Sequence, residues 1–197
     1  MNPRILVLTG GIGSGKSTAL RALEDLGYKT YSLDDYSRYL YRGELLDKVS
    51  DTFPEAIKDG DLDRKALGKI IAEDEAKRLV LNNLTHGKIL ESFKEDIRGQ
   101  EGKLAVEVPL YGEVKDRIDQ DFIIDRVIYI DADEDLRAKR LSKRENISLD
   151  HAYKLIKGQR LDYLNRDLAQ LKIKNNGTRE DLARALAQEL GVENESY

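Results

Sequence analysis

A glycine-rich stretch near the start of the chain has the residue types that bind a polyphosphate. Gly10, four further residues, and then Gly15, Lys16 and Ser17 match the pattern G-x-x-x-x-G-K-[ST], with an apolar run before it and a helical pattern after it. Glycines let backbone N–H groups face phosphate oxygens, the lysine reaches the β and γ phosphates, and the serine hydroxyl holds Mg²⁺. The complete pattern favours a nucleotide site over a solvated glycine-rich turn. The residues predicted to bind the nucleotide are Gly11, Ile12, Gly13, Ser14, Gly15, Lys16, Ser17 and Thr18.

Two acidic residues follow the second apolar run of the chain. Asp34 and Asp35 come directly after residues 28–33. The carboxyl ends of parallel strands face the ligand crevice of such sheets, so Asp34 is our candidate to accept a proton from an attacking hydroxyl. The alternative is that one of the two aspartates caps the helix that continues through Tyr39. Position alone leaves both interpretations open.

Basic residues gather in the segment 137–166. It holds nine Lys or Arg against three acidic residues, a local balance of +6 in a chain whose net charge is −4. Arginines on a movable segment can close over phosphates and neutralise charge in a transition state. A solvated helix face with ion pairs between successive turns is the alternative. Beside a phosphate-binding loop, the pattern favours a lid.

Short apolar runs alternate with longer helical patterns along the chain. This alternation predicts an α/β fold with a parallel sheet and helices on both faces. About 70 residues of helical composition separate the second strand from the third, and we expect that insertion to hold a substrate. The length suits a single domain. The five predicted strands are residues 4–8, 28–33, 104–108, 126–130 and 171–174.

The composition excludes several classes of site. The chain has no cysteine and two histidines, so neither a disulfide nor a thiolate or histidine-built metal site is expected, and any metal would come with the nucleotide. No apolar run approaches membrane length and no signal peptide is evident, which predicts a cytoplasmic protein without a membrane partner. The net charge is negative and the basic excess is confined to the segment 137–166, so no nucleic-acid partner is expected.

Further motifs extend the pattern beyond the phosphate loop. Together with the loop and Asp34, they resemble the dephospho-coenzyme A kinase family over nearly the whole chain. The additional residues that carry the resemblance are Leu62-Asp63-Arg64, His86, Pro109-Leu110 with Glu113, Arg140, Arg144, Gln159, Ala169, Ile173, Asn175, Asn176 and Gly177.

The resemblance implies a P-loop kinase with a five-stranded parallel sheet and helices on both faces. The implied reaction transfers the γ-phosphoryl of ATP, with Mg²⁺, to the ribose 3′-hydroxyl of dephospho-coenzyme A, giving coenzyme A and ADP. Another nucleoside, nucleotide or small-molecule acceptor is the alternative. The protein is expected to be a monomer or a weak homo-oligomer. The implied organisation is one domain over 1–197, with a core of 1–35, 101–139 and 166–192, a helical substrate-binding insertion over 36–100 and a helical lid over 140–165.

The family pattern also assigns roles to residues. Catalysis would use Asp34, Lys16 and Arg140, and Ser17 would hold the metal. Arg144 and Asn175 would join the loop in binding the nucleotide. The acceptor would be bound by Asp34, Arg64, His86, Pro109 and Leu110.

Some positions admit a second interpretation or depart from the family pattern. His86 could equally be a hydrogen-bonded packing residue. Because Ser32 replaces an aspartate, carboxylate support for the reacting groups is in question, whereas Asp34 itself is retained. The departures from the pattern are Ser32, Gly87, Tyr111, Gly112 and Gln170.

Overall fold

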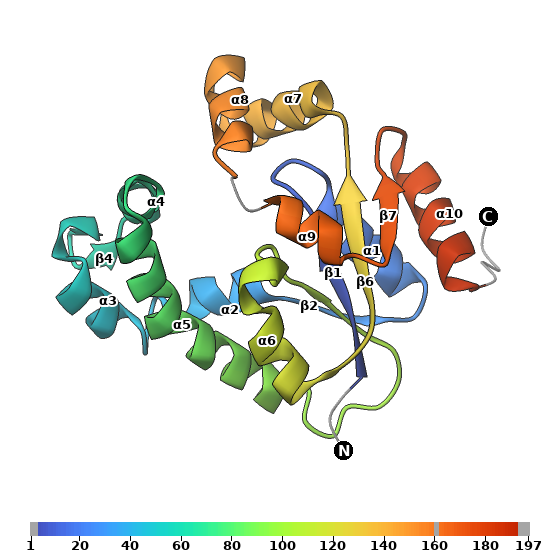
Figure 1. Cartoon of the computed structure of the whole chain (residues 1–197), viewed down its shortest axis with the longest axis horizontal. Helices are drawn as coiled ribbons and strands as arrows, with labels where there is room; N and C mark the ends of the chain where they lie inside the picture. The colour runs from blue at the N-terminus through green and yellow to red at the C-terminus, as the bar shows by residue number, and fades with distance from the viewer. Residues whose placement is uncertain (1–3, 160–161, 193–197) are drawn as a thin grey trace. The chain divides into compact units, whose positions relative to one another are not determined.

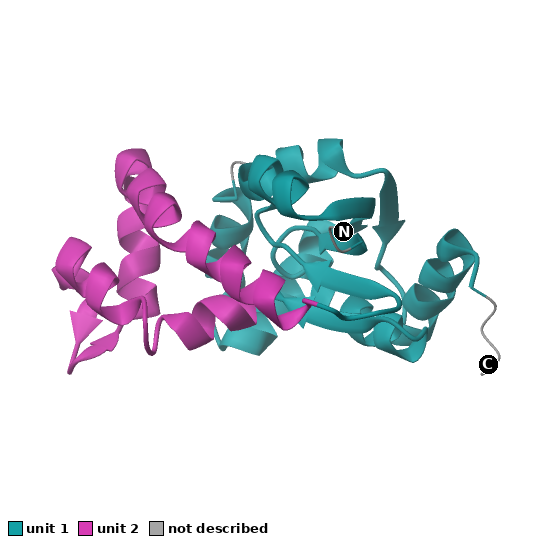
Figure 2. Cartoon of the chain, turned by 90° about the horizontal axis from the view of Figure 1, so that it is seen from below, with its two compact units in different colours: residues 1–32, 99–197 teal, residues 33–98 magenta. Residues whose placement is uncertain are grey.

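A computed structural model describes residues 4–159 and 162–192 of the chain. It contains two compact units, residues 1–32 with 99–197 and residues 33–98, which Figure 2 colours separately. The first unit is built around a five-stranded sheet (Figure 1). In chain order its elements are β1 (Arg4–Thr9), α1 (Lys16–Asp25), β2 (Lys29–Ser32), β5 (Leu104–Glu107), α6 (Tyr111–Asp121), β6 (Ile123–Asp131), α7 (Glu134–Glu145), α8 (Leu149–Lys157), α9 (Asp162–Leu168), β7 (Leu171–Lys174) and α10 (Arg179–Leu190).

The sheet has the order β2-β5-β1-β6-β7, and every neighbouring pair is parallel. Its central strands are buried and rich in Ile, Val and Leu, as expected where helices cover both faces of a parallel sheet. The register places Leu8 opposite Glu107 and Thr9 opposite Tyr129. The predicted parallel five-stranded fold is confirmed. β6 is longer than predicted, because it starts at Ile123 rather than at residue 126.

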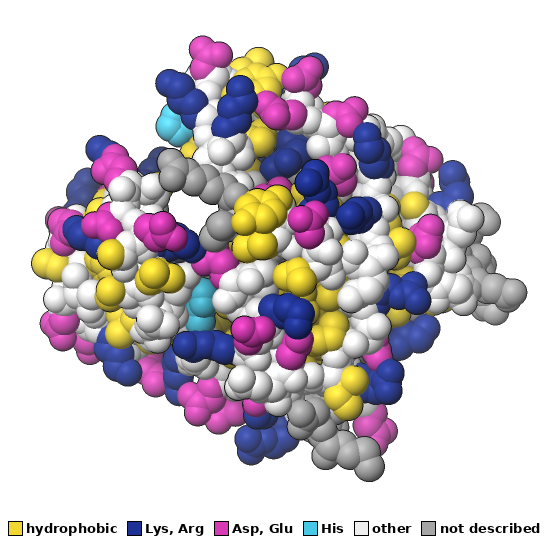
Figure 3. Space-filling view, viewed as in Figure 1, with side chains coloured by type: hydrophobic (Ala, Val, Ile, Leu, Met, Phe, Trp, Pro, Cys, Tyr) yellow, Lys and Arg dark blue, Asp and Glu magenta, His cyan; other side chains and the backbone are white. Residues whose placement is uncertain are grey.

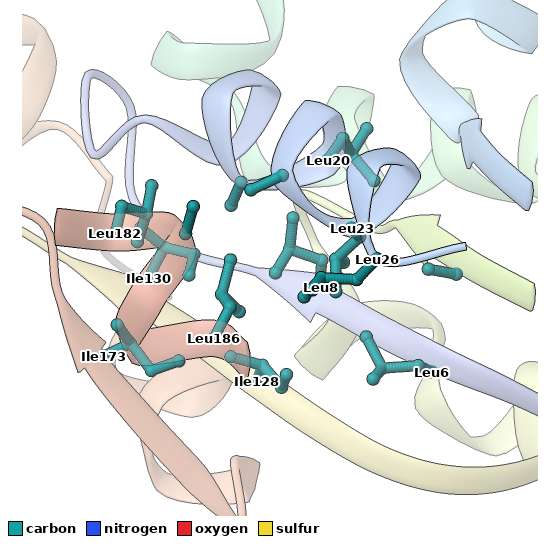
Figure 4. Packing of buried hydrophobic residues seen from close by; sticks show 14 of the residues in the cluster. Leu6, Leu8, Leu20, Leu23, Leu26, Ile128, Ile130, Ile173, Leu182 and Leu186 are labelled. Atoms are coloured by element: carbon teal, nitrogen blue, oxygen red, sulfur yellow. The ribbon is translucent and has the colours of Figure 1, made fainter. Parts of the chain in front are cut away.

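One face of the sheet is covered by α1 and α10. Alternate residues of β1 and β6, Leu6 and Leu8 with Ile128 and Ile130, lie against leucines of these two helices (Figure 4). The alternation follows from the two-residue side-chain period of a strand. The leucines that complete this core include Leu20, Leu23, Leu26, Leu182 and Leu186.

The other face carries α6 and α9, which contact each other. Tyr129 lies between Ile128 and Ile130 in β6 and therefore points to this side, where its hydroxyl donates to Asp162 Oδ2 at the start of α9 (2.7 Å). The helices α7 and α8 pack on each other through a small cluster that includes Leu141 and Ile156. Helices thus lie on both faces, and the carboxyl ends of the strands are left for loops.

The second unit is mainly helical. Its core is formed by Val49, Phe53, Leu67 and Leu81 with Ala56. The unit corresponds approximately to the predicted insertion over 36–100, and the single-domain organisation stays a prediction. Its elements are α2 (Leu33–Leu40), α3 (Leu46–Thr52), the 3-10 helix η1 (Pro54–Ala56), β3 (Ile57–Lys58), β4 (Asp61–Leu62), α4 (Arg64–Glu73) and α5 (Glu75–Asp96).

Truncation of Leu186 tests the α1–α10 core. Leu186 is fully buried, so Leu186→Ala should lower the free energy of unfolding by about 2–5 kcal/mol, through lost burial and the cavity left behind. Leu149, which is 45% exposed on α8, is the control, and Leu149→Ala should change it by less than about 0.5 kcal/mol. Urea unfolding followed by circular dichroism measures both, and equal losses would contradict this placement of the core.

Candidate functional site

The glycine-rich loop joins β1 to α1 at the carboxyl edge of the sheet. Gly13 has φ of +77° and Gly15 has φ of +98°, a region that residues with a Cβ rarely adopt. A Cβ on Gly13 would lie 2.7 Å from the carbonyl oxygen of Arg137, and one on Gly15 would strike the side-chain amide of Asn175. The loop therefore needs glycine at both positions, for its backbone angles and for the close packing around it.

Lys16 is the first residue of α1, and its ammonium group lies over the loop. Its Nζ donates to the carbonyl oxygens of Gly10 (2.9 Å) and Gly11 (3.3 Å). It also lies 3.9 Å from Oε1 of Glu107, a buried carboxylate at the end of β5. Ser32, at the end of β2, donates to Glu107 Oε2 (3.4 Å). The start of α1 and the ends of β5 and β2 thus place a cation, a carboxylate and a hydroxyl together.

Glu107 was not among the residues predicted from the sequence. It lies within the apolar run 104–108, where the run itself predicted only a buried strand. A usable signal was present, because a charged residue is rarely buried without a partner. Glu107 is the single charged residue of its apolar run, next to the strand that carries the glycine loop, so a buried carboxylate with a charged partner could have been expected there.

Arg137 of α7 holds the outer part of the loop. Its Nε donates to the carbonyl oxygen of Ile12 (2.9 Å), and its terminal nitrogen donates to Oε1 of Gln159 (3.1 Å). The same glutamine oxygen accepts the backbone N–H of Ile12 (2.7 Å). Arg137 belongs to the basic segment, but no role was predicted for it. The structure brings that segment to the loop through this arginine and Gln159.

Two predicted residues approach the loop at Ser14. Asn175, which follows β7, donates from Nδ2 to the Ser14 carbonyl oxygen (2.7 Å), and Arg140 reaches the same oxygen at 3.5 Å. Partial burial lowers the pKa of the Arg140 guanidinium, but arginine keeps its charge at neutral pH. No carboxylate of the described residues pairs with Arg140, so its charge is directed at the loop alone.

Arg144 does not reach the loop. It is exposed and pairs with Glu145 (2.8 Å) at the end of α7. Its predicted role in binding the nucleotide stays a prediction. Figure 3 shows lysines and arginines over α7 and α8, at the top of the view, interspersed with acidic side chains.

Tyr129 and Asp162 form a second, partly buried polar pair. Besides accepting from the Tyr129 hydroxyl, Asp162 Oδ2 lies 3.9 Å from the Arg137 guanidinium. Burial, followed by the hydrogen bond and the charge of Asp162, raises the pKa of Tyr129. Arg137 therefore joins the loop above it to α9 and β6 below it.

The acidic pair after β2 is divided between two environments. The helix α2 begins at Leu33, so Asp34 and Asp35 lie in its first turn, one and two residues beyond its start. Asp35 pairs with Arg38 (2.8 Å) in the next turn. Asp34 is exposed. The capping position would fall at Ser32 rather than at Asp34, although both carboxylates still complement the helix N-terminus.

The remaining predicted acceptor residues fall in both units. In the second unit, the Arg64 guanidinium lies 5.7 Å from the centre of the Tyr41 ring, and His86 is half-buried in α5. In the first unit, Pro109 and Leu110 form the turn between β5 and α6, and Leu110 is 43% exposed.

The described residues contain neither a metal-ligand cluster nor a membrane-spanning helix. Over 4–159 and 162–192, no cluster of three or more His, Cys, Asp or Glu side chains is placed to hold a metal ion. Within the same ranges, no helix is both long enough and apolar enough to cross a membrane.

Comparison with known proteins gives a consistent family. The family model described as dephospho-CoA kinase matches residues 4–181. The chain belongs to this family. A dephospho-CoA kinase from Fusobacterium nucleatum is 32% identical over 186 residues, covering 92% of this chain and 94% of the relative. The family establishes a kinase of coenzyme A biosynthesis, which implies use of ATP, and confirms the resemblance of the sequence motifs.

Solved structures agree with the dephospho-CoA kinase family. A crystal structure of a Thermus thermophilus protein has a TM-score of 0.80 and 28% identity, covering 97% of this chain and 98% of that one. A dephospho-CoA kinase from Campylobacter jejuni has a TM-score of 0.60 and 25% identity, covering 95% and 96%. The likeness covers the core and the insertion alike.

Three departures from the dephospho-CoA kinase pattern have structural partners in this chain. Ser32 donates to Glu107, so a carboxylate is present beside this position, supplied by the neighbouring strand. Gln170 exchanges hydrogen bonds with the backbone of Val127 and so joins the start of β7 to β6. Gly112 packs against α9. For Gly87, nothing in the structure explains the replacement.

Substitution of Gly15 tests the loop. Gly15→Ala adds a methyl group where φ is positive and where Asn175 is in contact, so the Kd for a non-hydrolysable ATP analogue should rise at least about 100-fold. Gly43→Ala is the matched control, because a Cβ there meets nothing within 4 Å. Isothermal titration calorimetry measures both. Unchanged affinity in Gly15→Ala would contradict the assignment of the loop.

Stability at alkaline pH tests the environment of Tyr111. Burial, with the charge of Asp119 and a hydrogen bond to it, raises the pKa of Tyr111 from 10.0 to about 12. This contribution to stability is complete below pH 10 and is lost as the pH rises toward 12. Tyr111→Phe should therefore lose less unfolding free energy across that range than the native chain. Tyr163→Phe, which removes an exposed phenol, is the control, and parallel curves for Tyr111→Phe and native chain would contradict the expectation.

Proposed function

We propose that the chain transfers the γ-phosphoryl group of ATP to the ribose 3′-hydroxyl of dephospho-coenzyme A, giving coenzyme A and ADP. The observation that carries the proposal is the position of Lys16, over the glycine loop and 3.9 Å from the buried Glu107. The Lys16 ammonium group donates to two loop carbonyl oxygens. Phosphate oxygens of a bound nucleotide can take the place of these acceptors. Family membership supports the choice of acceptor.

The loop and its basic neighbours bind and neutralise the triphosphate. Backbone N–H groups from Gly11 to Thr18 and the N-terminus of α1 favour phosphate oxygens. Lys16 contributes a point charge to the β and γ phosphates, and Arg140 contributes a guanidinium that has no carboxylate partner within the described part of the chain. Phosphoryl transfer depends mainly on such positioning and charge stabilisation. Arg137 and Asn175 keep the loop in the shape that these contacts require.

Asp34 orients the acceptor hydroxyl and accepts its proton. It follows the end of β2 by two residues, and β2 ends beside Glu107 in the sheet register. Asp35 already pairs with Arg38, whereas the Asp34 side chain is exposed. A carboxylate within hydrogen-bond reach of the attacking hydroxyl performs this role in kinases.

The donor set near Lys16 fits Mg²⁺. Ser17 supplies a hydroxyl at the first turn of α1, and Glu107 supplies a carboxylate from the adjacent strand, which are the hard oxygen ligands that Mg²⁺ accepts alongside nucleotide phosphates. When bound, the ion would neutralise charge on the β and γ phosphates. Ser17 and Glu107 are the residues that would hold it.

The acceptor is assigned to residues of both units. Arg64 and His86 would contact its polar groups, and Pro109 and Leu110 would contact its apolar part. The proposal also includes a cytoplasmic location and a monomeric or weakly associated chain. Family members act on a small molecule, and nothing in the proposal requires a macromolecular partner.

Measurement of product formation tests the activity. With Mg²⁺ and ATP, ADP release by the purified chain should depend on dephospho-coenzyme A, and the product should be heavier by about 80 Da, the mass of one phosphoryl group. Cleavage of the pyrophosphate linkage of the product, followed by mass spectrometry of the adenosine-containing fragment, shows whether that fragment carries the added group. ATP binding without acceptor-dependent ADP would contradict the proposed acceptor.

Replacement of Asp34 separates proton transfer from binding. Asp34→Asn should lower kcat by about 10²–10⁴-fold, because the amide cannot accept the proton, while the Kd for the ATP analogue stays within about twofold. Asp35→Asn changes the same charge one residue away and should keep kcat within about threefold. Steady-state kinetics decide, and similar rates for the two variants would remove Asp34 from its role.

A further inference from the structure

Asn165 is a buried amide side chain in α9, and only 3% of its surface is exposed. Its Oδ1 accepts the backbone N–H of Gly112 (2.8 Å), and its Nδ2 donates to the backbone carbonyl oxygen of Pro109 (2.9 Å). Pro109 lies between β5 and α6, and Gly112 is the second residue of α6; we call this segment, which contains Leu110, the Pro109–Gly112 turn. One side chain thus fixes both ends of the turn.

The turn is also packed against α9. A Cβ at Gly112 would lie 2.7 Å from the Cβ of Leu164, closer than two carbon atoms pack. The absence of a side chain at Gly112 therefore lets the turn approach the helix closely enough for both Asn165 hydrogen bonds. Gly112 and Tyr111 are the positions at which this turn departs from the family pattern.

The helix that carries Asn165 is itself fixed to the sheet. Asp162, three residues earlier on α9, accepts from the Tyr129 hydroxyl of β6 (2.7 Å). On the other side of the turn, Tyr111 is buried at the start of α6, with its hydroxyl 3.5 Å from Asp119. The turn therefore lies between two anchored helices, and Asn165 is the polar contact that spans it.

We propose that Asn165 is a positioning residue for the acceptor. It holds the Pro109–Gly112 turn in the conformation that presents Leu110 and the Pro109 ring to dephospho-coenzyme A. The inference rests on the proposed function, which assigns this turn to the acceptor. Among the described residues, the hydrogen bonds of the Asn165 side chain go to Gly112 and Pro109 and none goes to the glycine loop, so its loss acts on the acceptor and leaves the nucleotide contacts in place.

Kinetics of Asn165→Ala test the assignment. The KM for dephospho-coenzyme A should rise at least about 10-fold, and the KM for ATP should stay within twofold. Gln170→Ala is the matched control, because Gln170 also bonds to backbone, at Val127 of β6 (2.6 Å), but does not contact the turn. It should leave both KM values within twofold. An unchanged acceptor KM in Asn165→Ala, or an equal rise in both KM values, would overturn the proposal.

A second variant, Asn165→Asp, tests the proposal even if Asn165→Ala does not fold. The carboxyl introduced by Asn165→Asp can still accept from Gly112, but it can donate to Pro109 only when protonated, and burial raises the pKa of such a group. The acceptor KM of this variant, divided by the native value at the same pH, should fall as the pH is lowered from 8 to 6, by at least about threefold. A ratio that does not change with pH would overturn the proposal.

The two proposals fail in different ways. If the native chain does not phosphorylate dephospho-coenzyme A, the proposed function is wrong and the inference falls with it. If the native chain is active and the Asn165 variants keep the native KM, the inference alone is wrong.

Discussion

The parallel pairing of β1 with its two neighbours is the constraint on which the site depends. Because Leu8 lies opposite Glu107 and Thr9 opposite Tyr129, β1 and β5 end within one residue of each other, and β6 continues two residues further, to Asp131. The glycine loop starts there, Lys16 reaches back over it, and Glu107 meets the lysine from the side. A slip of one residue in either pairing would turn these side chains to the opposite face. The buried leucines and isoleucines on the α1–α10 face fix that register.

The glycine loop is local in sequence but is held by distant residues. Three side chains from distant segments each form a hydrogen bond with the loop backbone. They are Arg137 of α7, Gln159, which follows α8, and Asn175, which follows β7. A flexible loop would lose conformational entropy on binding a triphosphate. Here much of that ordering is provided by side chains more than a hundred residues away, so the fold prepares the loop before a nucleotide arrives.

The sequence predicts the parts of the site that depend on local pattern. The loop, the strands and Asp34 follow from short motifs and from apolar runs, and the structure has the five strands within a few residues of the predicted bounds. The charge pattern alone does not predict which basic residues of α7 contact the loop, and Arg140 was predicted only through the family resemblance. Arg137 and Arg140 contact the loop, and Arg144, one turn further along α7, pairs with Glu145 instead. That selection depends on where α7 starts and how it packs, which is tertiary information.

The same limit applies to burial in the insertion. Leu79 and Val80 fit an apolar helical pattern, yet they are 51% and 48% exposed, while Leu81 is buried. A helix with apolar residues on several sides does not reveal which side meets its neighbours. Asn165 was missed for a related reason, because an asparagine within a polar, basic segment gives no sign that it is buried.

The close contact between Gly112 and Leu164 links two segments that are far apart in the chain. A Pro109–Gly112 turn taken from a related enzyme and carrying a side chain at position 112 would collide with α9 here, unless position 164 were made smaller at the same time. Grafting of this turn between members of the family must therefore transfer the turn and α9 together. In this chain the turn and α9 are sterically coupled and must change together, although more than fifty residues separate Gly112 from Leu164.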